Sequence, residues 1–183
     1  MTVYGHVPRI QRLMSANVPE MVDVWRMVAA RRGFEGRFPL SSLERLKGLL
    51  LDSEGEATFA LQFDRDDTLQ VSYAELRIDT GLPLECQRSL ERFVLPVHIV
   101  QRLGLIRDED EESALPEEYE ALLVPEDGML GLSSLVEDEL ILAVPVVPVS
   151  PDKDAVDRDW QPGQEELAKA NPFAALAAMK KKN

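Results

Sequence analysis

The hydrophobic pattern that begins at Ala57 constrains the fold of this chain more than any other feature. Phe59, Leu61 and Phe63 alternate with small or polar residues, and a period of two is typical of a strand with one buried face. Further strands are predicted at Leu69 to about Glu85, about Leu90 to Leu105, and Tyr119 to Val124, with turns at Asp64–Asp67 and Cys86–Ser89. Because these links are short, we expect an antiparallel β-meander or an incomplete barrel rather than a parallel sheet. Pro83 and Pro96 cannot donate a backbone hydrogen bond, so we expect them at edge positions or bulges.

Helical spacing predicts two helices before the sheet and one after it. The first spans Asn17 to Gly33, and the second begins at Ser41 or Ser42 and continues to Leu50. The third, Leu132 to Ala143, contains a block of three acidic residues, which we expect to serve function more than stability. The fold class is therefore predicted as α+β.

The chain is expected to form one domain over residues 1–149, followed by a flexible tail over residues 150–183. The segment from Ser150 to Ala170 carries too little apolar surface to fold alone. After it, Asn171 can cap a short helix with Pro172 at its first position, and the lysines Lys180, Lys181 and Lys182 lie favourably at its negative end.

Charge is distributed unevenly along the chain. The net charge is −13, yet residues 1–50 sum to +4 and residues 51–150 sum to −17. Because bulk phosphate repels such a body, contact with nucleic acid requires local basic patches, and a basic protein is an easier partner. The candidate contacts are Arg31, Arg32 and Arg37, then Arg88 and Arg92, then Lys180, Lys181 and Lys182.

Signals for catalysis, cofactors or metals are weak. There is no phosphate-binding loop, dinucleotide fingerprint or nucleophile elbow. His98 lies in a strand pattern, which favours a partly buried structural residue over a catalytic one. The single Cys86 and the lack of a signal peptide or membrane span predict a cytoplasmic protein.

Four segments resemble the YceD family of large ribosomal RNA subunit accumulation proteins. They are Leu84–Arg88, Ala114–Glu120, Val136–Val149 and Asn171–Phe173, and they occur in the order and spacing of the family. Motif residues among them are Cys86, Glu137, Asp138, Glu139, Pro145, Asn171, Pro172 and Phe173. The resemblance implies a role in the synthesis, processing or stability of large-subunit (23S) ribosomal RNA, with no catalytic residues to assign.

Two partners stay open at this point. The chain is expected to bind large-subunit ribosomal RNA or its precursor particle, with no membrane or DNA partner. The alternative is an acidic binding module or chaperone for a basic large-subunit ribosomal protein. A hydrolase or nuclease is a distant third.

The first prediction concerns zinc. Many members of the family have a second cysteine three positions after the first, where this chain has Ser89. A zinc site needs about four ligands, so the purified protein should contain no stoichiometric zinc. Elemental analysis that finds about one zinc per chain would contradict this.

Overall fold

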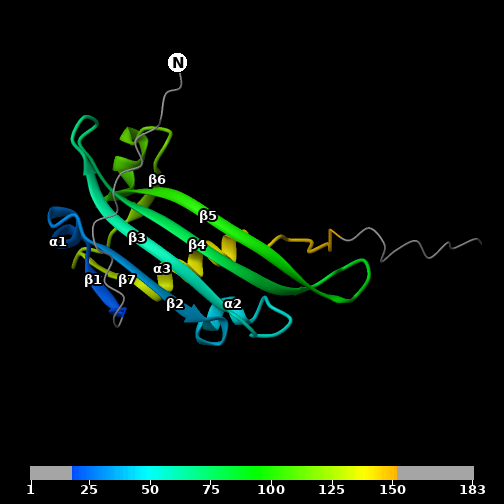
Figure 1. The fold of residues 1–183 in the computed structure, drawn as a ribbon. Coiled ribbons are helices and arrows are strands. Elements are labelled where there is room, and N and C mark those ends of the chain that lie inside the picture. The colour runs from blue at the N-terminus through cyan, green and yellow to red at the C-terminus, as the bar shows by residue number, and fades with distance from the viewer. Residues whose placement is uncertain (1–17, 152–183) are drawn as a thin grey trace, which may run out of the picture. The chain divides into compact units, whose positions relative to one another are not determined.

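The computed structural model describes residues 18–151, whose main feature is an open five-stranded sheet with the order β2-β3-β4-β5-β6 (Figure 1). The strands are β2 (Gly33–Pro39), β3 (Glu56–Asp66), β4 (Val71–Glu85), β5 (Arg92–Ile106) and β6 (Glu120–Leu123). The pairs β2–β3, β3–β4 and β4–β5 are antiparallel, and each joins two strands that are consecutive in the sequence. The predicted α+β meander is therefore confirmed, and the sheet does not close into a barrel.

The last strand departs from the expected antiparallel arrangement. β6 pairs with β5 in parallel, with Leu103 opposite Glu120 and Ile106 opposite Leu123. The connection contains the 3-10 helix η2 (Glu109–Ala114). This connection is long enough to carry the chain back along β5, so that β6 can run parallel to it. The short turns between β3, β4 and β5 allow only antiparallel neighbours.

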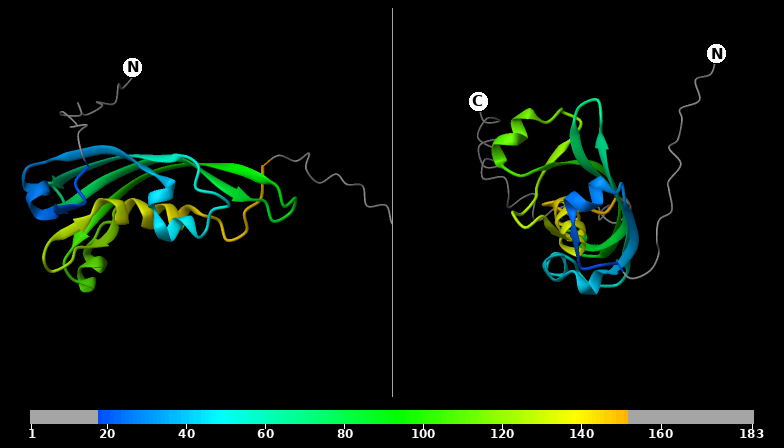
Figure 2. Two further views of the ribbon diagram at one scale, coloured as in Figure 1. Left: turned by 90° about the horizontal axis from the view of Figure 1, so that it is seen from below. Right: turned by 90° about the vertical axis from the view of Figure 1, so that its left-hand side faces the viewer.

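One face of the sheet is covered by the helix α3 (Leu132–Ala143), which has the bounds predicted from the sequence (Figure 2). Its side chains Leu132, Leu135, Val136 and Leu140 are buried. They join a single core with the inward side chains of the strands, among them Phe59, Leu61, Phe63, Leu76, Ile78, Leu103 and Leu105. The alternation that begins at Ala57 thus marks the face on which α3 packs.

The first predicted helix is wrong in extent. Residues Met21–Asp23 form strand β1, and only Val24–Ala29 form the helix α1. β1 pairs with a strand that the sequence did not predict, β7 (Met129–Gly131). Asp23 then caps α1, because its carboxylate accepts a hydrogen bond from the backbone N–H of Arg26 at 3.0 Å. Gly33 begins β2 instead of ending the helix.

The second predicted helix is also shorter than expected. It is divided into the 3-10 helix η1 (Leu40–Ser42) and the helix α2 (Glu44–Lys47). The predicted serine cap does not form, since the Ser42 hydroxyl donates to the carbonyl of Pro39 at 2.7 Å. The N–H groups at the start of α2 instead meet Glu137, from α3.

The two prolines lie at edge positions, as predicted. β3 pairs with β4 only as far as Asp79, so Pro83 lies beyond it and has β5 as its single neighbouring strand. Pro96 lies before Leu103, where β6 begins to pair, so β4 is the one strand beside it among residues 18–151. Neither proline therefore removes a donor between two strands.

Expectations about the tail, with its linker and terminal helix, lie outside the described residues. Between residues 18 and 151, none of the helices combines the length and the apolar character needed to cross a bilayer.

Replacing Leu140 should test how far the fold depends on α3. Its side chain is fully buried, so Leu140→Ala should lower the free energy of unfolding by about 2–5 kcal/mol. Leu142 on the same helix is 73% exposed, and Leu142→Ala should change it by about 0.5 kcal/mol or less. Urea denaturation of both variants measures the difference. Equal losses would show that α3 does not pack on the sheet through Leu140.

Candidate functional site

Three of the arginines predicted to contact RNA are already paired with carboxylates of this chain, namely Arg37, Arg92 and Arg31. Arg37 Nη1 lies 2.9 Å from Glu56 Oε1. Arg92 Nε lies 2.6 Å from Asp52 Oδ2, and its Nη2 lies 3.4 Å from Glu54 Oε2. The hydrogen bond that Arg92 donates to Asp52 raises the pKa of Arg92 and lowers the pKa of Asp52. These cations are therefore partly neutralised at the protein surface.

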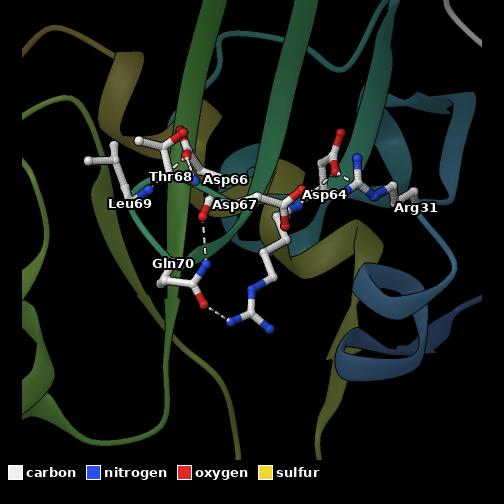
Figure 3. Close-up of polar contacts among 8 residues, drawn as sticks. Arg31, Asp64, Asp66, Asp67, Thr68, Leu69 and Gln70 are labelled. Atoms are coloured by element: carbon white, nitrogen blue, oxygen red, sulfur yellow. Dashed lines mark hydrogen bonds and ion pairs between the residues drawn. The ribbon is translucent and has the colours of Figure 1, made fainter.

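Arg31 is held in the same way by the last residues of β3 and the turn after it, which begins at Asp67 and not at Asp64 as predicted (Figure 3). Its Nε lies 3.3 Å from Asp64 and its Nη2 lies 2.9 Å from Asp67. The hydrogen bond with Asp67, followed by the charge of Asp64, raises the pKa of Arg31. The acidic residues that the sequence predicts as a turn thus also bind the segment that follows α1.

The turn itself is organised by Asp66, which sequence reasoning did not single out. Its Oδ1 accepts hydrogen bonds from the backbone N–H groups of Thr68, at 2.8 Å, and Leu69, at 2.9 Å (Figure 3). The bond from Leu69 contributes most to the lowered pKa of Asp66. Gln70 adopts a left-handed backbone with φ of 57°. The side-chain amide of Gln70 donates to the carbonyl of Asp67 at 2.6 Å.

Arg32 and Arg88 differ from the other predicted contacts. Both are exposed, and neither forms an ion pair with another residue of the described part of the chain. Lys180, Lys181 and Lys182 lie outside the described residues, as do Asn171, Pro172 and Phe173. Among the described residues, Arg32 precedes β2 near the end of the sheet where β3 turns into β4, whereas Arg88 lies in the β4–β5 turn at the other end.

Cys86 lies at the turn between β4 and β5 and is buried. Its pKa is lowered to about 6, chiefly by the Ser89 hydroxyl and then by the backbone N–H of Ser150, which lies 3.4 Å from the sulfur. The N–H of Gln87 donates to the carbonyl of Pro148 at 2.9 Å. These bonds attach the segment after α3, which includes Pro145, to the β4–β5 turn. Cys86 thus has a structural contact in this fold.

The surroundings of His98 differ from those expected. His98 was expected to be partly buried, but its side chain is 67% exposed on the outer face of the sheet. Its Nδ1 lies 2.5 Å from Asp79 Oδ1, across the β4–β5 pair. Residues 18–151 contain no group of three His, Cys, Asp or Glu side chains placed to hold a metal ion.

Glu137 connects α3 to α2 through several hydrogen bonds. Its Oε1 accepts from the backbone N–H of Arg45 at 2.7 Å and of Leu46 at 3.1 Å, and its Oε2 accepts from Arg45 Nε at 3.0 Å. Burial raises the pKa of Glu137, but these bonds outweigh it and the net pKa is lowered. Asp138 adds a 2.6 Å bond to Arg45 Nη1.

Glu139 has a different environment, although it is buried to the same extent as Glu137, with 8% exposure for each. Burial, with the nearby charge of Glu120, raises the pKa of Glu139. Gln101 partly opposes this shift, and its amide also donates to Glu120 at 2.6 Å. Within this acidic block, Glu137 and Glu139 are therefore both buried, and their environments differ. The expectation that the three acids serve function more than stability stays a prediction, although the contacts of Glu137 also support the fold.

Glu137→Gln should destabilise the fold, whereas Glu139→Gln should not. The lowered pKa of Glu137 stabilises the fold fully above the ordinary glutamate pKa, and this contribution is lost as pH falls below it. At neutral pH, Glu137→Gln should cost about 1–3 kcal/mol. The raised pKa of Glu139 means that its ionised form destabilises the fold, so Glu139→Gln should be neutral or stabilising.

Urea denaturation between pH 7 and pH 4 checks this pair of variants. The advantage of Glu139→Gln should shrink as falling pH protonates Glu139 in the wild type. The deficit of Glu137→Gln should persist down to the ordinary glutamate pKa and shrink only below it. Comparable destabilisation of both variants at pH 7 would contradict the different structural roles of Glu137 and Glu139.

The comparisons with known proteins agree on one family. The family profile described as "Large ribosomal RNA subunit accumulation protein YceD" matches residues 74–180. A protein of Haemophilus influenzae with the same description is 32% identical over 176 residues, which cover 93% of this chain and 100% of that protein. No solved structure matches this chain. The chain belongs to the YceD family.

Proposed function

We propose that this protein is a non-enzymatic factor in the biogenesis of the large ribosomal subunit. In this role it supports the synthesis, processing or stability of 23S ribosomal RNA in the cytoplasm. The observation that carries the proposal is the family match, since the relative in Haemophilus influenzae is described as a "Large ribosomal RNA subunit accumulation protein" and is similar along its whole length. The partner is then ribosomal RNA or a precursor particle that contains it.

The electrostatics of the surface favour a protein as the direct contact within such a particle. Residues 51–150 have a net charge of −17. Arg31, Arg37 and Arg92 are occupied by carboxylates of the same chain, so a phosphate would have to displace those partners. A basic ribosomal protein gains from the same surface without that cost. This supports a second candidate function, in which the protein binds or shields a basic large-subunit ribosomal protein.

A strain that lacks the gene tests the proposed function. We expect sucrose gradients to show fewer large subunits relative to small ones, with precursor 23S RNA accumulating or mature 23S RNA reduced. Plasmid-borne wild-type protein should restore the profile. Unchanged subunit ratios and unchanged precursor RNA would contradict the proposal.

Affinity purification with and without RNase separates the two candidate contacts. Ribosomal proteins that stay bound after RNA digestion support direct binding to protein, whereas their loss supports an association through RNA. Arg32→Glu/Arg88→Glu is the informative variant, because these two arginines form no ion pair within residues 18–151. Arg37→Glu is its control, since Arg37 is already paired with Glu56. Direct RNA binding predicts that only the double variant loses the particle.

A further inference from the structure

Most of one edge of β5 has no strand beside it. β4 pairs with β5 from Arg92 to Gly104. On the other edge, β6 pairs only from Leu103 to Ile106. In Figure 1, β6 accordingly lies beside one end of β5, and the rest of β5 borders the sheet. Among residues 18–151, the edge from Arg92 to Arg102 therefore has no strand partner; we call it the free edge.

The orientation of the backbone along the free edge follows from its continuation beside β6. The carbonyl of Ile106 accepts a hydrogen bond from Val124 N–H at 2.8 Å, on the β6 side. Backbone groups alternate between the two edges of a strand, so Val94, His98, Val100 and Arg102 direct their N–H and C=O groups to the free edge. Pro96 falls in the same series, which explains how it can lie in β5 without interrupting the bonds to β4.

Proline commonly protects an edge strand from unwanted pairing. Here Pro96 removes one donor near the middle. Beyond it, His98 and Val100 keep complete donor and acceptor sets, and Arg102 keeps its N–H, whereas its C=O lies at the start of the pairing with β6. This stretch is in line with β6. A strand added there would occupy the same row as β6 and would extend the sheet without displacing any described element.

The end of the free edge opens into an acidic pocket of about 520 Å³. Its walls include Val100 and Arg102 from β5 and the carboxylate residues Glu112, Glu117, Glu118 and Glu120. Arg102 is the single basic residue of the lining, and its guanidinium is already placed over the Tyr73 ring, 5.9 Å from the centroid. The pocket therefore suits a lysine or arginine side chain at the end of an added strand.

Apolar surface lies on the α3 side of the free edge. Phe93, Leu95, Val97 and Ile99 point to this side and are only partly buried against the core. On α3, Glu139 is near Gln101 of β5, and Leu142 follows three residues later on the same flank with 73% exposure. An added strand with alternating side chains could cover this surface.

We propose that the free edge of β5 binds an extended basic segment of a partner protein by β-strand addition. Backbone groups from His98 to Arg102 pair with the segment, its apolar side chains face Leu142 and Ile99, and a basic side chain enters the acidic pocket. The proposal deepens the second candidate function but does not depend on the ribosomal role. The negative charge of the pocket favours a basic protein segment over RNA, because RNA would bring its phosphates close to four carboxylates.

The first test uses the full chain and a fluorescein-labelled peptide of about ten alternating lysines and valines. Fluorescence anisotropy should detect binding of this peptide and not of its counterpart with glutamate in place of lysine. Two further peptides carry N-methyl groups either on every lysine or on every valine. In an extended peptide, the N–H groups of the lysines point to one edge and those of the valines to the other. Only one of the two sets faces β5, so the peptide methylated on the other set should bind, and the peptide methylated on the facing set should lose about tenfold or more in affinity.

Variants of the protein give an independent test. Val100→Pro removes one N–H from the free edge and leaves the bonds to β4, whereas Val100→Ala removes only side-chain atoms. Val100→Pro should weaken binding about tenfold or more, and Val100→Ala should retain it. Glu117→Gln/Glu118→Gln should bind more weakly and with less dependence on salt. Thermal melts verify that each variant is folded, and if Val100→Pro is not, the N-methylated peptides decide.

Several results would overturn the proposal. Equal binding by Val100→Pro and Val100→Ala, or by both N-methylated peptides, would exclude pairing at the free edge. Failure of the lysine–valine peptide to bind, with binding of a single-stranded RNA of similar length, would assign the surface to nucleic acid. A dimer that Val100→Pro dissociates would assign the edge to a second copy of this chain. A deletion strain with normal ribosomes, by contrast, would contradict only the ribosomal role.

Discussion

The apolar face of the meander has to be covered by α3, and the rest of the structure depends on this packing. Three long strands direct alternate side chains to one side, and a sheet with one apolar face is stable only when another element buries it. α3 does so with Leu132, Leu135, Val136 and Leu140. The helix also carries Glu137, whose carboxylate holds the start of α2. A single helix thus covers the sheet and fixes the segment between β2 and β3.

A second constraint is the pairing of arginines with carboxylates of the same chain. The acidic residues outnumber the basic ones, so several arginines have a carboxylate nearby, as Arg31, Arg37, Arg45 and Arg92 do. Exposed pairs of this kind contribute little to stability. Their larger consequence is for recognition, because they leave an acidic surface with few available cations. The protein is therefore better suited to attract basic polypeptides than to follow a phosphate backbone.

The sequence predicted those elements whose cause is local. The alternation of Phe59, Leu61 and Phe63 defines a strand by itself, and the spacing from Leu132 to Ala143 defines α3. The predictions failed for elements whose position depends on residues far away in the sequence. β1 exists because it pairs with β7, and α2 begins where Glu137 meets its N–H groups. The same limit applies to the candidate site: the arginines could be named, but their carboxylate partners could not, and the free edge of β5 became visible only when the short reach of β6 was known.

The two parts of the proposed binding surface would act at different stages of an encounter. Charges on Glu117 and Glu118 act over about 10 Å at moderate salt, so they attract a basic segment before contact and weaken as salt rises. Backbone pairing along His98 to Arg102 acts only at hydrogen-bond distance and is little affected by screening. Because a mutated rim charge mainly changes the association rate while a lost buried contact changes dissociation, acidity and edge pairing contribute separately to selectivity. An acidic surface alone would bind any cation, and a free edge alone would bind any strand; their adjacency in this fold restricts the partner to a segment that is basic and extended at once.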